Sequence, residues 1–411
     1  MENFDHKTYR DSLASTLLKE EDHRKRRKLL KLAQFTNEYG AAKQLHAKDM
    51  GRELTPERQD MYEALAEKVG DTPLVEYKGE VPDGNKIFLK LECDNQLGHS
   101  HYDRVYLKLF YEKEKLGIIH PGDNVFETST GSAGISFAAI GRELGYKCHV
   151  AMPAGGEKAR EQATAEQGAQ VHLTPAEQYI RGFRDFIKKF LKEHPDYVFI
   201  NHSMGNILGK GSDINENAVV AMQDVATESE DQLHEQQEGH FDYVISAMGN
   251  GTNTLGISQR MNEISPTTKI VGFEMMSSAV AFQQKYPGKY QETFGKEVEP
   301  KKFSRHSMPG TSFPGIDFPA FNKAIGLLDD IKLVTDEKTT AEYKQMAGIE
   351  DEPEALIHWD NSEIEQPLEE FGRSTKAGVA VALRIIHENE VVGKKFLVIA
   401  YDKTERYDVK K

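Results

Sequence analysis

From residue 72 to the end of this 411-residue chain, short apolar segments alternate with helical segments of roughly 10–15 residues. Strands that alternate with helices of this length form βαβ units, in which parallel strands make a sheet with helices on both faces. The chain is long enough for two such domains. The sequence therefore predicts two doubly wound α/β domains with mainly parallel sheets, and the cleft between them is the expected binding site. The predicted strands lie at residues 86–92, 124–129, 147–153, 169–175, 196–200, 242–248, 269–275, 330–335 and 395–402.

The predicted domains follow a helical extension. Residues 1–70 are rich in Lys, Glu, Arg, Leu and Ala and contain no strand-like run, so we predict an extension at 1–70, a first α/β domain at 71–212 and a second at 213–411. A basic cluster at 22–33 is interpreted as a solvated helix face rather than a nucleic-acid patch, because acidic segments follow it. The acidic, glutamine-rich segment 226–240 is expected to be an exposed helix or a linker.

Charge and composition exclude several classes of partner. The net charge of -14 disfavours binding to nucleic acid or to a membrane surface, because both normally require clustered Lys and Arg. The chain has no run of about 18 apolar residues, and its first residues lack the apolar run of a signal peptide. With only Cys93 and Cys148, a disulfide framework or a zinc ribbon is not expected. We therefore expect a soluble, cytoplasmic protein that binds small molecules.

Three glycine-containing turns follow predicted strands, which is where ligands bind in open α/β sheets. The first, ETSTGSAGISFAAIGRELG at 127–145, carries hydroxyls and glycine at the start of a helical run. A helix N-terminus presents unpaired N–H groups and a partial positive charge, so this turn is suited to a carboxylate. Simple helix capping by Ser and Thr is the alternative interpretation. The residues concerned are Ser129, Thr130, Gly131 and Ser132.

The second turn, MGNGTNTLG at 248–256, is suited to a phosphate group. Gly249 and Gly251 let the backbone approach a ligand closely, and Thr252 and Asn253 add side-chain donors. The turn lacks the lysine of a P-loop and the spacing of a dinucleotide fingerprint. A phosphate monoester is therefore favoured over a nucleoside triphosphate or NAD.

The third turn, GRSTKAGVAVALRII at 372–386, places two hydroxyls before a helical run. Ser374 and Thr375 are in position to cap this helix, which is the commoner use of such residues. Because the turn follows the other two along the chain, contact with a shared ligand is the second interpretation.

The order of these turns resembles that of the cysteine synthase group, the fold-type II pyridoxal-phosphate enzymes that include cystathionine β-synthase, threonine deaminase and the tryptophan synthase β chain. VGDTPLVEY at 69–77 resembles the group's IGNTPL opening, ETSTGSAGI its substrate-carboxylate loop, and MGNGTNTLG its phosphate-binding loop. STKAGVAVAL is similar to its S-S-G-A-A-V-A-A-A-L segment, and FLVIAYDKTERY to its final strand and D-S-G-x-x-Y turn. The resemblance extends from residue 69 to residue 411.

The resemblance implies a cofactor, a reaction class and an assembly. Pyridoxal 5'-phosphate is the implied cofactor, and β-elimination or β-replacement on a small amino acid, such as an activated serine, is the implied reaction. A homodimer is also implied, with residues 1–70 as a candidate contact surface. The implied cofactor contacts are Gly249, Asn250, Gly251, Thr252, Asn253 and, at the pyridine nitrogen, Thr375. The implied contacts to the substrate carboxylate are Ser129, Thr130, Gly131 and Ser132.

The group's lysine motif, E-x-x-N-P-x-G-S-x-K-D-R, has no lysine in this chain. Its counterpart is ECDNQLGHSHYDR at 92–104, which places Tyr102 or His101, depending on the register, where the lysine stands. In the group, that lysine forms a Schiff base with the cofactor and moves the substrate's α-proton. A phenol or an imidazole cannot form this bond, because it requires a primary amine. Three ways to hold the cofactor remain: without a covalent bond, as an aldimine with an amino acid, or on another lysine. The positions of Lys108 and Lys376 in the chain disfavour each of these two lysines as the third alternative.

Three functions remain open from the sequence. The first is a diverged pyridoxal-phosphate enzyme of the reaction class above, and the second is a non-catalytic homologue that binds the cofactor, a metabolite or a protein without turnover. The third is an enzyme that needs no lysine and uses His101 or Tyr102, beside Ser100, for acid–base chemistry, because histidine titrates near neutral pH. A metal site of two histidines with Cys93 lacks a partner at fixed spacing, so no metal is expected.

Overall fold

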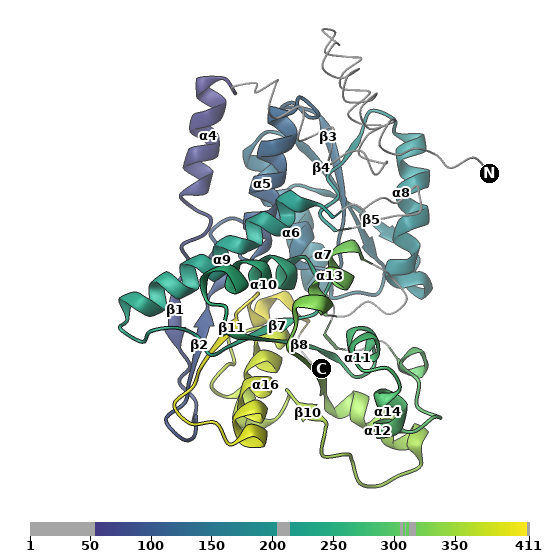
Figure 1. The fold of residues 1–411 in the computed structure, drawn as a ribbon. Coiled ribbons are helices and arrows are strands. Elements are labelled where there is room, and N and C mark those ends of the chain that lie inside the picture. Colours follow the sequence, from purple (N-terminus) through teal and green to yellow (C-terminus); the bar gives the residue numbers. More distant parts are fainter. Residues whose placement is uncertain (1–53, 204–213, 305–306, 309, 312–317, 409–411) are drawn as a thin grey trace, which may run out of the picture.

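The computed structural model describes residues 54–203, 214–304, 307–308, 310–311 and 318–408, which form two sheets covered by helices (Figure 1). The larger sheet has the strand order β1-β2-β11-β7-β8-β9-β10; its β1–β2 pair is antiparallel and its other pairs are parallel. The smaller sheet is parallel, in the order β5-β4-β3-β6. The predicted α/β class with mainly parallel sheets is confirmed.

The elements have the following bounds. The strands are β1 (Leu74–Glu76), β2 (Lys86–Lys90), β3 (Asn124–Thr128), β4 (Lys147–Pro153), β5 (Gln170–Thr174), β6 (Val198–Phe199), β7 (Tyr243–Ala247), β8 (Lys269–Met275), β9 (Asp330–Thr335), β10 (Ile357–His358) and β11 (Lys395–Ile399). The helices used below are α4 (Pro56–Ala66), α5 (Tyr102–Lys115), α6 (Ser132–Glu143), α7 (Lys158–Glu166), α8 (Gly182–Glu193), α9 (Glu216–Glu235), α10 (Thr252–Ile264), α13 (Pro319–Leu327), α14 (Glu337–Ala347) and α16 (Arg373–Asn389).

The central strands of both sheets are buried on both faces, which explains why they read as nearly continuous apolar runs. Consecutive residues of a strand point to opposite faces. In β3, Val125 therefore packs into the core that includes α6, while Phe126 packs into the core that includes α8. In β8, Ile270 and Val271 divide in the same way between the core of α9 and α10 and the core of α16.

Each predicted apolar segment contains a strand, and β4, β8 and β9 coincide with their predictions from end to end. The prediction missed β1 and β10, which are only 3 and 2 residues long. Strands this short carry too few residues to show a hydrophobic period. They lie at the two edges of the larger sheet.

The predicted division at residue 212 differs from the observed sheets. It assigns β1 and β2 to the first domain, whereas β2 pairs with β11 along its whole length in the larger sheet. The first and the last strand of the described residues thus lie in one sheet, and the smaller sheet is inserted between β2 and β7. Of the predicted extension, residues 1–53 lie outside the described residues, and the remainder contains the helix α4.

The acidic segment 226–240 forms a helix end and a turn, and most of its residues from 231 onward are exposed as predicted, whereas residues 226–230 are buried or half-buried. Its residues as far as Glu235 complete α9, a helix of 20 residues. Ala226 and Leu233 are fully buried on one face of that helix. The acidic character misled the prediction because Glu228 is paired with cations of other elements rather than with solvent.

A buried ionic network joins β2, α5 and α9. Arg104 donates two hydrogen bonds to Glu92 and two to Glu228, at 2.6 to 2.8 Å. Lys90 Nζ lies 2.8 Å from Glu228, and the amide of Asn95 donates to Glu92 at 3.0 Å. Each buried carboxylate therefore faces a cation, as the cost of burying charge requires. The network ties the turn that precedes α5 to the larger sheet.

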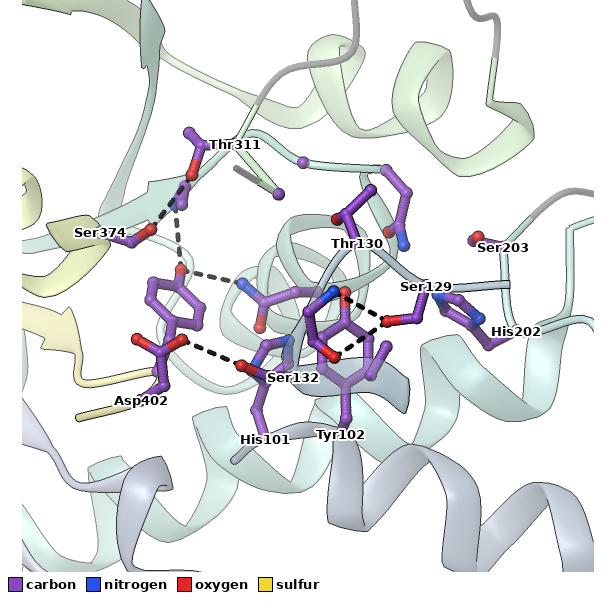
Figure 2. A pocket seen from close by; sticks show the side chains of 18 of the residues that line it. His101, Tyr102, Ser129, Thr130, Ser132, His202, Ser203, Thr311, Ser374 and Asp402 are labelled. Carbon is purple, nitrogen blue, oxygen red and sulfur yellow. Dashed lines mark hydrogen bonds between the residues drawn. The ribbon is translucent and has the colours of Figure 1, made fainter. Parts of the chain in front are cut away.

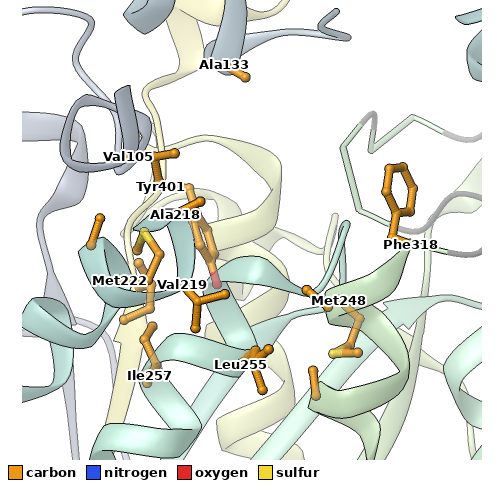
Figure 3. Packing of buried hydrophobic residues seen from close by; sticks show 14 of the residues in the cluster. Val105, Ala133, Ala218, Val219, Met222, Met248, Leu255, Ile257, Phe318 and Tyr401 are labelled. Atoms are coloured by element: carbon orange, nitrogen blue, oxygen red, sulfur yellow. The ribbon is translucent and has the colours of Figure 1, made fainter. Parts of the chain in front are cut away.

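Packing between α5, α9 and α10 supplies much of the larger core (Figure 3). Val105 of α5, Met222 of α9 and Ile257 of α10 are almost completely buried there. Tyr401, which follows β11, reaches the same cluster. This core fixes the N-termini of α5 and α10 relative to each other, and both of them border the pocket described below.

Neither a membrane span nor a metal cluster is found within the described ranges. None of the helices there is long and apolar enough to cross a membrane. In the same residues, no group of three or more His, Cys, Asp or Glu side chains is placed to hold a metal ion.

Candidate active site

A pocket lies where the carboxyl ends of β3, β7 and β11 meet the N-termini of α5 and α16 (Figure 2). This edge of the strands is where open α/β sheets bind ligands. Most of the predicted site residues line it, namely His101, Tyr102, Ser129, Thr130, Gly131, Ser132, Gly249, Asn250, Gly251 and Asn253. The other predicted residues, Ser100, Thr252 and Thr375, are buried beside the pocket and are not among its lining residues.

The loop between β3 and α6 is shaped by the hydroxyl of Ser129. This oxygen accepts hydrogen bonds from the N–H groups of Gly131 and Gly134, at 3.0 and 2.8 Å, and donates to the Gly131 carbonyl. Ser129 therefore holds the loop in place, whereas Thr130 and Ser132 present hydroxyls to the pocket. Gly131 is required because an added Cβ would lie 2.2 Å from Arg160 Nη1. The N-terminus of α6 thus faces the pocket as the sequence predicted, in the geometry that favours a carboxylate.

A buried cluster around Asp402 forms one wall of the pocket. Ser132 donates to Asp402 Oδ2 at 2.9 Å, and Arg160 Nη2 lies 3.1 Å from the same oxygen. Tyr407 donates to Asp402 Oδ1 at 3.1 Å, and its ring lies under the Arg160 guanidinium. The sequence analysis did not find Arg160, which contacts Asp402 from 242 positions away in the chain.

The turn between β7 and α10 forms the opposite wall. Gly251 has a φ of 86°, which favours glycine, and a Cβ there would lie 2.4 Å from the Phe321 backbone of α13. The Thr252 N–H donates to Asn250 Oδ1 at 2.9 Å, which accounts for the position of Thr252 outside the lining. Asn253 donates to the Tyr401 hydroxyl at 3.0 Å, and its own Oδ1 has no hydrogen-bond partner within the described residues. The first turn of α10 is a ready site for an anion.

At the third turn, the hydroxyl that faces the pocket is not the one predicted. Ser374 lines the pocket and shares a 3.1 Å hydrogen bond with Thr311. Thr375 is fully buried, and its Oγ1 has no partner among the described residues. Because α16 begins at Arg373, successive side chains already turn by about 100° each. Ser374 is therefore the hydroxyl of this turn that lines the pocket, and the assignment of Thr375 to a ligand contact stays a prediction.

The turn before α5 brings two of the three proposed acid–base residues into the pocket. His101 and Tyr102 line it, with ring centroids 4.1 Å apart. Burial lowers the pKa of His101 to about 4 and raises the pKa of Tyr102 to about 12. Both side chains are therefore neutral at pH 7. Ser100 does not reach the pocket, because it is bonded to Ser136 at 2.9 Å.

No lysine is found among the described residues that line the pocket. Lys108 lies on the outer side of α5, where its Nζ is 3.1 Å from Glu112. Lys376 is buried in α16 and also lies outside the lining. The two lysines disfavoured from sequence are thus both away from the pocket wall.

A histidine that the sequence analysis missed lines the pocket beside a buried carboxylate. His202 Nδ1 lies 3.2 Å from Glu127 Oε2 and 3.0 Å from the Tyr106 hydroxyl. Glu127 is in β3, and His202 follows β6, the neighbouring strand. The one sequence signal for the pair is that each lies close to the carboxyl end of a predicted strand.

Comparison with known proteins agrees with this geometry. The family model described as pyridoxal-phosphate dependent enzyme matches residues 65–355. Cysteine synthase B of Pseudomonas aeruginosa is 29% identical over 233 residues, which are 56% of this chain and 72% of that protein. Cysteine synthase B of Escherichia coli is 30% identical over 228 residues, which are 55% of this chain and 70% of that protein.

Solved structures show the same fold. Cysteine synthase from Entamoeba histolytica superposes with a TM-score of 0.61 and 25% identity, covering 84% of this chain and 91% of that one. The O-acetylserine dependent cystathionine beta-synthase of Helicobacter pylori gives a TM-score of 0.63 at 20% identity, covering 84% and 97%. With a family model matched over most of its length and the pocket at the expected strand ends, this chain belongs to the family of pyridoxal-phosphate dependent enzymes.

Proposed function

We propose that the chain binds pyridoxal phosphate without a covalent link to a lysine, and that it catalyses β-elimination or β-replacement on a small amino acid. The observation that carries the proposal is a pocket that combines an anion site at α10 with hydroxyls and a helix N-terminus at α6, yet has no lysine among its described lining residues. The cysteine synthase relatives support the reaction class.

The residues of the pocket fit the cofactor apart from the missing amine. The first turn of α10, with Gly249, Asn250 and Gly251, would hold the phosphate. Ser374 would face the pyridine nitrogen, and the unpartnered Oδ1 of Asn253 is a further acceptor at this wall. When bound, pyridoxal phosphate supplies an electron-withdrawing ring that stabilises negative charge at the α-carbon of an amino acid.

The loop at residues 129–132 would orient the amino acid. Its backbone N–H groups at the start of α6, together with the hydroxyl of Thr130, would bind the substrate carboxylate. The hydroxyl of Ser132 is already committed to Asp402, so this oxygen can still accept a hydrogen bond but has no second proton to donate. The carboxylate would lie against a wall that also contains the paired cation Arg160.

A non-catalytic homologue is the second candidate, and one observation favours it. The rings of His101, Tyr102 and Tyr401 lie together at the pocket, with His101 and Tyr401 centroids 5.1 Å apart. These rings occupy space next to the residues proposed to hold the cofactor, and therefore leave less room for the cofactor and a substrate together. The third possibility, acid–base chemistry by His101 or Tyr102, is disfavoured because a pKa of about 4 makes His101 a weak base and a pKa of about 12 makes Tyr102 a weak acid at pH 7.

Product formation separates the two candidates. The purified chain is incubated with pyridoxal phosphate and serine derivatives that carry a β-leaving group, and release of the α-keto acid is followed with time. The proposed enzyme releases keto acid above the rate of the free cofactor. A rate equal to that of the free cofactor, from protein that retains cofactor, would favour the non-catalytic homologue.

Introducing the missing amine provides a gain-of-function prediction. Because Tyr102 begins α5 and lines the pocket, we expect Tyr102→Lys to attach the cofactor covalently. Borohydride reduction followed by peptide mass analysis should locate the adduct at position 102. Tyr111→Lys, the same exchange on α5 but outside the pocket lining, is the matched control and should give no adduct. An unmodified Tyr102→Lys variant that is folded and retains cofactor would show that this register is wrong.

A further inference from the structure

We infer that His202, oriented by Glu127, is the residue that moves the substrate's α-proton in this chain. The inference rests on the proposed function and deepens it, because it assigns to a histidine the proton transfer for which the described lining residues offer no amine. It is carried by the arrangement of β3, β6 and α5 around one imidazole ring.

The Glu127 carboxylate is held in a fixed position. It is fully buried at the end of β3, which pairs in parallel with β6. The Thr128 N–H donates to Oε1 at 2.8 Å, and the backbone N–H of His202 donates to Oε2 at 3.1 Å. Both carboxylate oxygens are therefore bound by backbone, so Glu127 can orient the imidazole beside it without moving.

The contacts of Nδ1 favour one tautomer of His202. Nδ1 lies 3.2 Å from Glu127 Oε2 and 3.0 Å from the Tyr106 hydroxyl. A carboxylate only accepts hydrogen bonds, whereas a phenol hydroxyl can donate or accept. Because a proton on Nδ1 suits both neighbours, we assign the ring proton to Nδ1, which leaves Nε2 as the basic nitrogen, as in other carboxylate–histidine pairs.

The position of His202 in the pocket suits proton transfer at the substrate. Figure 2 shows His202 beside Ser129, at the loop proposed for the substrate carboxylate and across the pocket from Ser374. Among the described residues, both polar contacts of the ring use Nδ1, so we assign Nε2 as the nitrogen that meets a ligand. The Tyr102 ring packs edge-on against the imidazole, with centroids 5.5 Å apart.

The groups that face His202 have separate roles. Glu127 comes from β3, Tyr102 and Tyr106 come from α5, and His101 precedes α5 and interacts electrostatically with His202. Burial keeps His101 uncharged at pH 7, and the two tyrosines are likewise neutral. The carboxylate of Glu127 is thus the charged group in contact with the imidazole, and it stabilises the imidazolium that proton transfer creates.

In the assigned step, the bond between the substrate's Cα and its hydrogen breaks. The proton passes to Nε2 of His202, and the electron pair stays on Cα; pyridoxal phosphate, when bound, would supply the electron-withdrawing ring that stabilises it. In exchange, the imidazolium returns a proton to Cα. In β-elimination, the electron pair forms the second Cα–Cβ bond, the bond from Cβ to the leaving group breaks, and the imidazolium gives its proton to the leaving group. Proton count and charge are thereby restored, and no oxidant or reductant is needed.

Two measurements on the full chain test the inference. The first is exchange of the α-proton of a small amino acid in deuterated water with pyridoxal phosphate present. His202→Gln should slow exchange by about 10²–10⁴-fold and leave cofactor retention unchanged. His172→Gln, the same exchange at a histidine of β5 outside the pocket, should have the wild-type rate. A His202→Gln rate within about threefold of wild type would overturn the inference and leave the proposed function standing.

The second measurement needs no cofactor. Nitrogen-15 NMR of the histidine side chains should show His202 protonated at Nδ1, and a ring protonated at Nε2 would overturn the inference. Tyr106→Phe, a milder change than replacing the buried Glu127, should keep this tautomer because the carboxylate remains. If the wild-type chain neither retains cofactor nor exchanges the α-proton, the proposed function fails and the inference fails with it.

Discussion

Replacing Gly251 by alanine is expected to abolish stable binding of pyridoxal phosphate. The added Cβ would lie 2.4 Å from the Phe321 backbone, and the residue would have to keep a φ of 86°. The turn must therefore shift, and it carries Gly249 and Asn250, which form the proposed phosphate site. We expect the dissociation constant to rise more than about tenfold, which corresponds to about 1.4 kcal/mol. Equilibrium titration followed by absorbance measures it.

The control for this prediction separates backbone strain from the steric clash. Gly348 ends α14 with a φ of 67°, and a Cβ there meets nothing within 4 Å. Gly348→Ala should lower the free energy of unfolding by only about 1–2 kcal/mol, which is the cost of a left-handed backbone for a residue other than glycine. Cofactor binding should be unchanged. Equal cofactor affinity in Gly251→Ala and the wild type would contradict the placement of the phosphate at α10.

Replacing Arg104 by methionine should produce the largest loss of stability. Arg104 donates to both Glu92 and Glu228, so its removal leaves a fully buried Glu92 without its bidentate partner. Breaking a buried pair in this way costs about 3–5 kcal/mol, because the remaining charge is uncompensated. Denaturant unfolding followed by circular dichroism measures the change. Arg142→Met is the control, because Arg142 pairs with Glu143 on the surface. This substitution should lower the free energy of unfolding by about 0–1 kcal/mol.

The same network predicts how stability depends on pH. Burial would raise the pKa of Glu228, but hydrogen bonds and charge from Arg104 and Lys90 outweigh it and lower the pKa to about 2. A carboxylate with a lowered pKa stabilises the fold above its unfolded pKa, here about 4.5, and this stabilisation is lost as the pH falls toward 2. Wild type should therefore lose stability between about pH 4.5 and 2, and Arg104→Met should lose less over that window. Parallel acid dependences in the two proteins would contradict the role given to Arg104.

The strands and the three turns could be predicted because their signals are local. A buried parallel strand such as β4 is a continuous apolar run that ends in turn residues. The glycines at 131 and 251 likewise mark places where the backbone approaches another segment closely. Most of the pocket wall could therefore be located from the sequence alone.

The errors arose where the answer depends on contacts between distant segments. The acidic part of α9 looked solvated because Arg104, its partner, lies 124 positions away from Glu228. Glu127 and His202 are 75 positions apart in the chain and are brought together by the pairing of β3 with β6. The choice between Ser374 and Thr375 depends on the residue at which α16 begins, and helix boundaries are poorly determined by sequence.

The central claim is that this chain binds pyridoxal phosphate, without a covalent link to a lysine, in a pocket whose described lining residues include no lysine. The most direct test is the visible absorption spectrum of the wild-type protein after incubation with the cofactor and desalting, followed by borohydride reduction and peptide mass analysis. The account predicts that cofactor is retained after desalting and that no lysine carries a reduced adduct. A reduced adduct on any lysine, or complete loss of the cofactor on desalting, would contradict it.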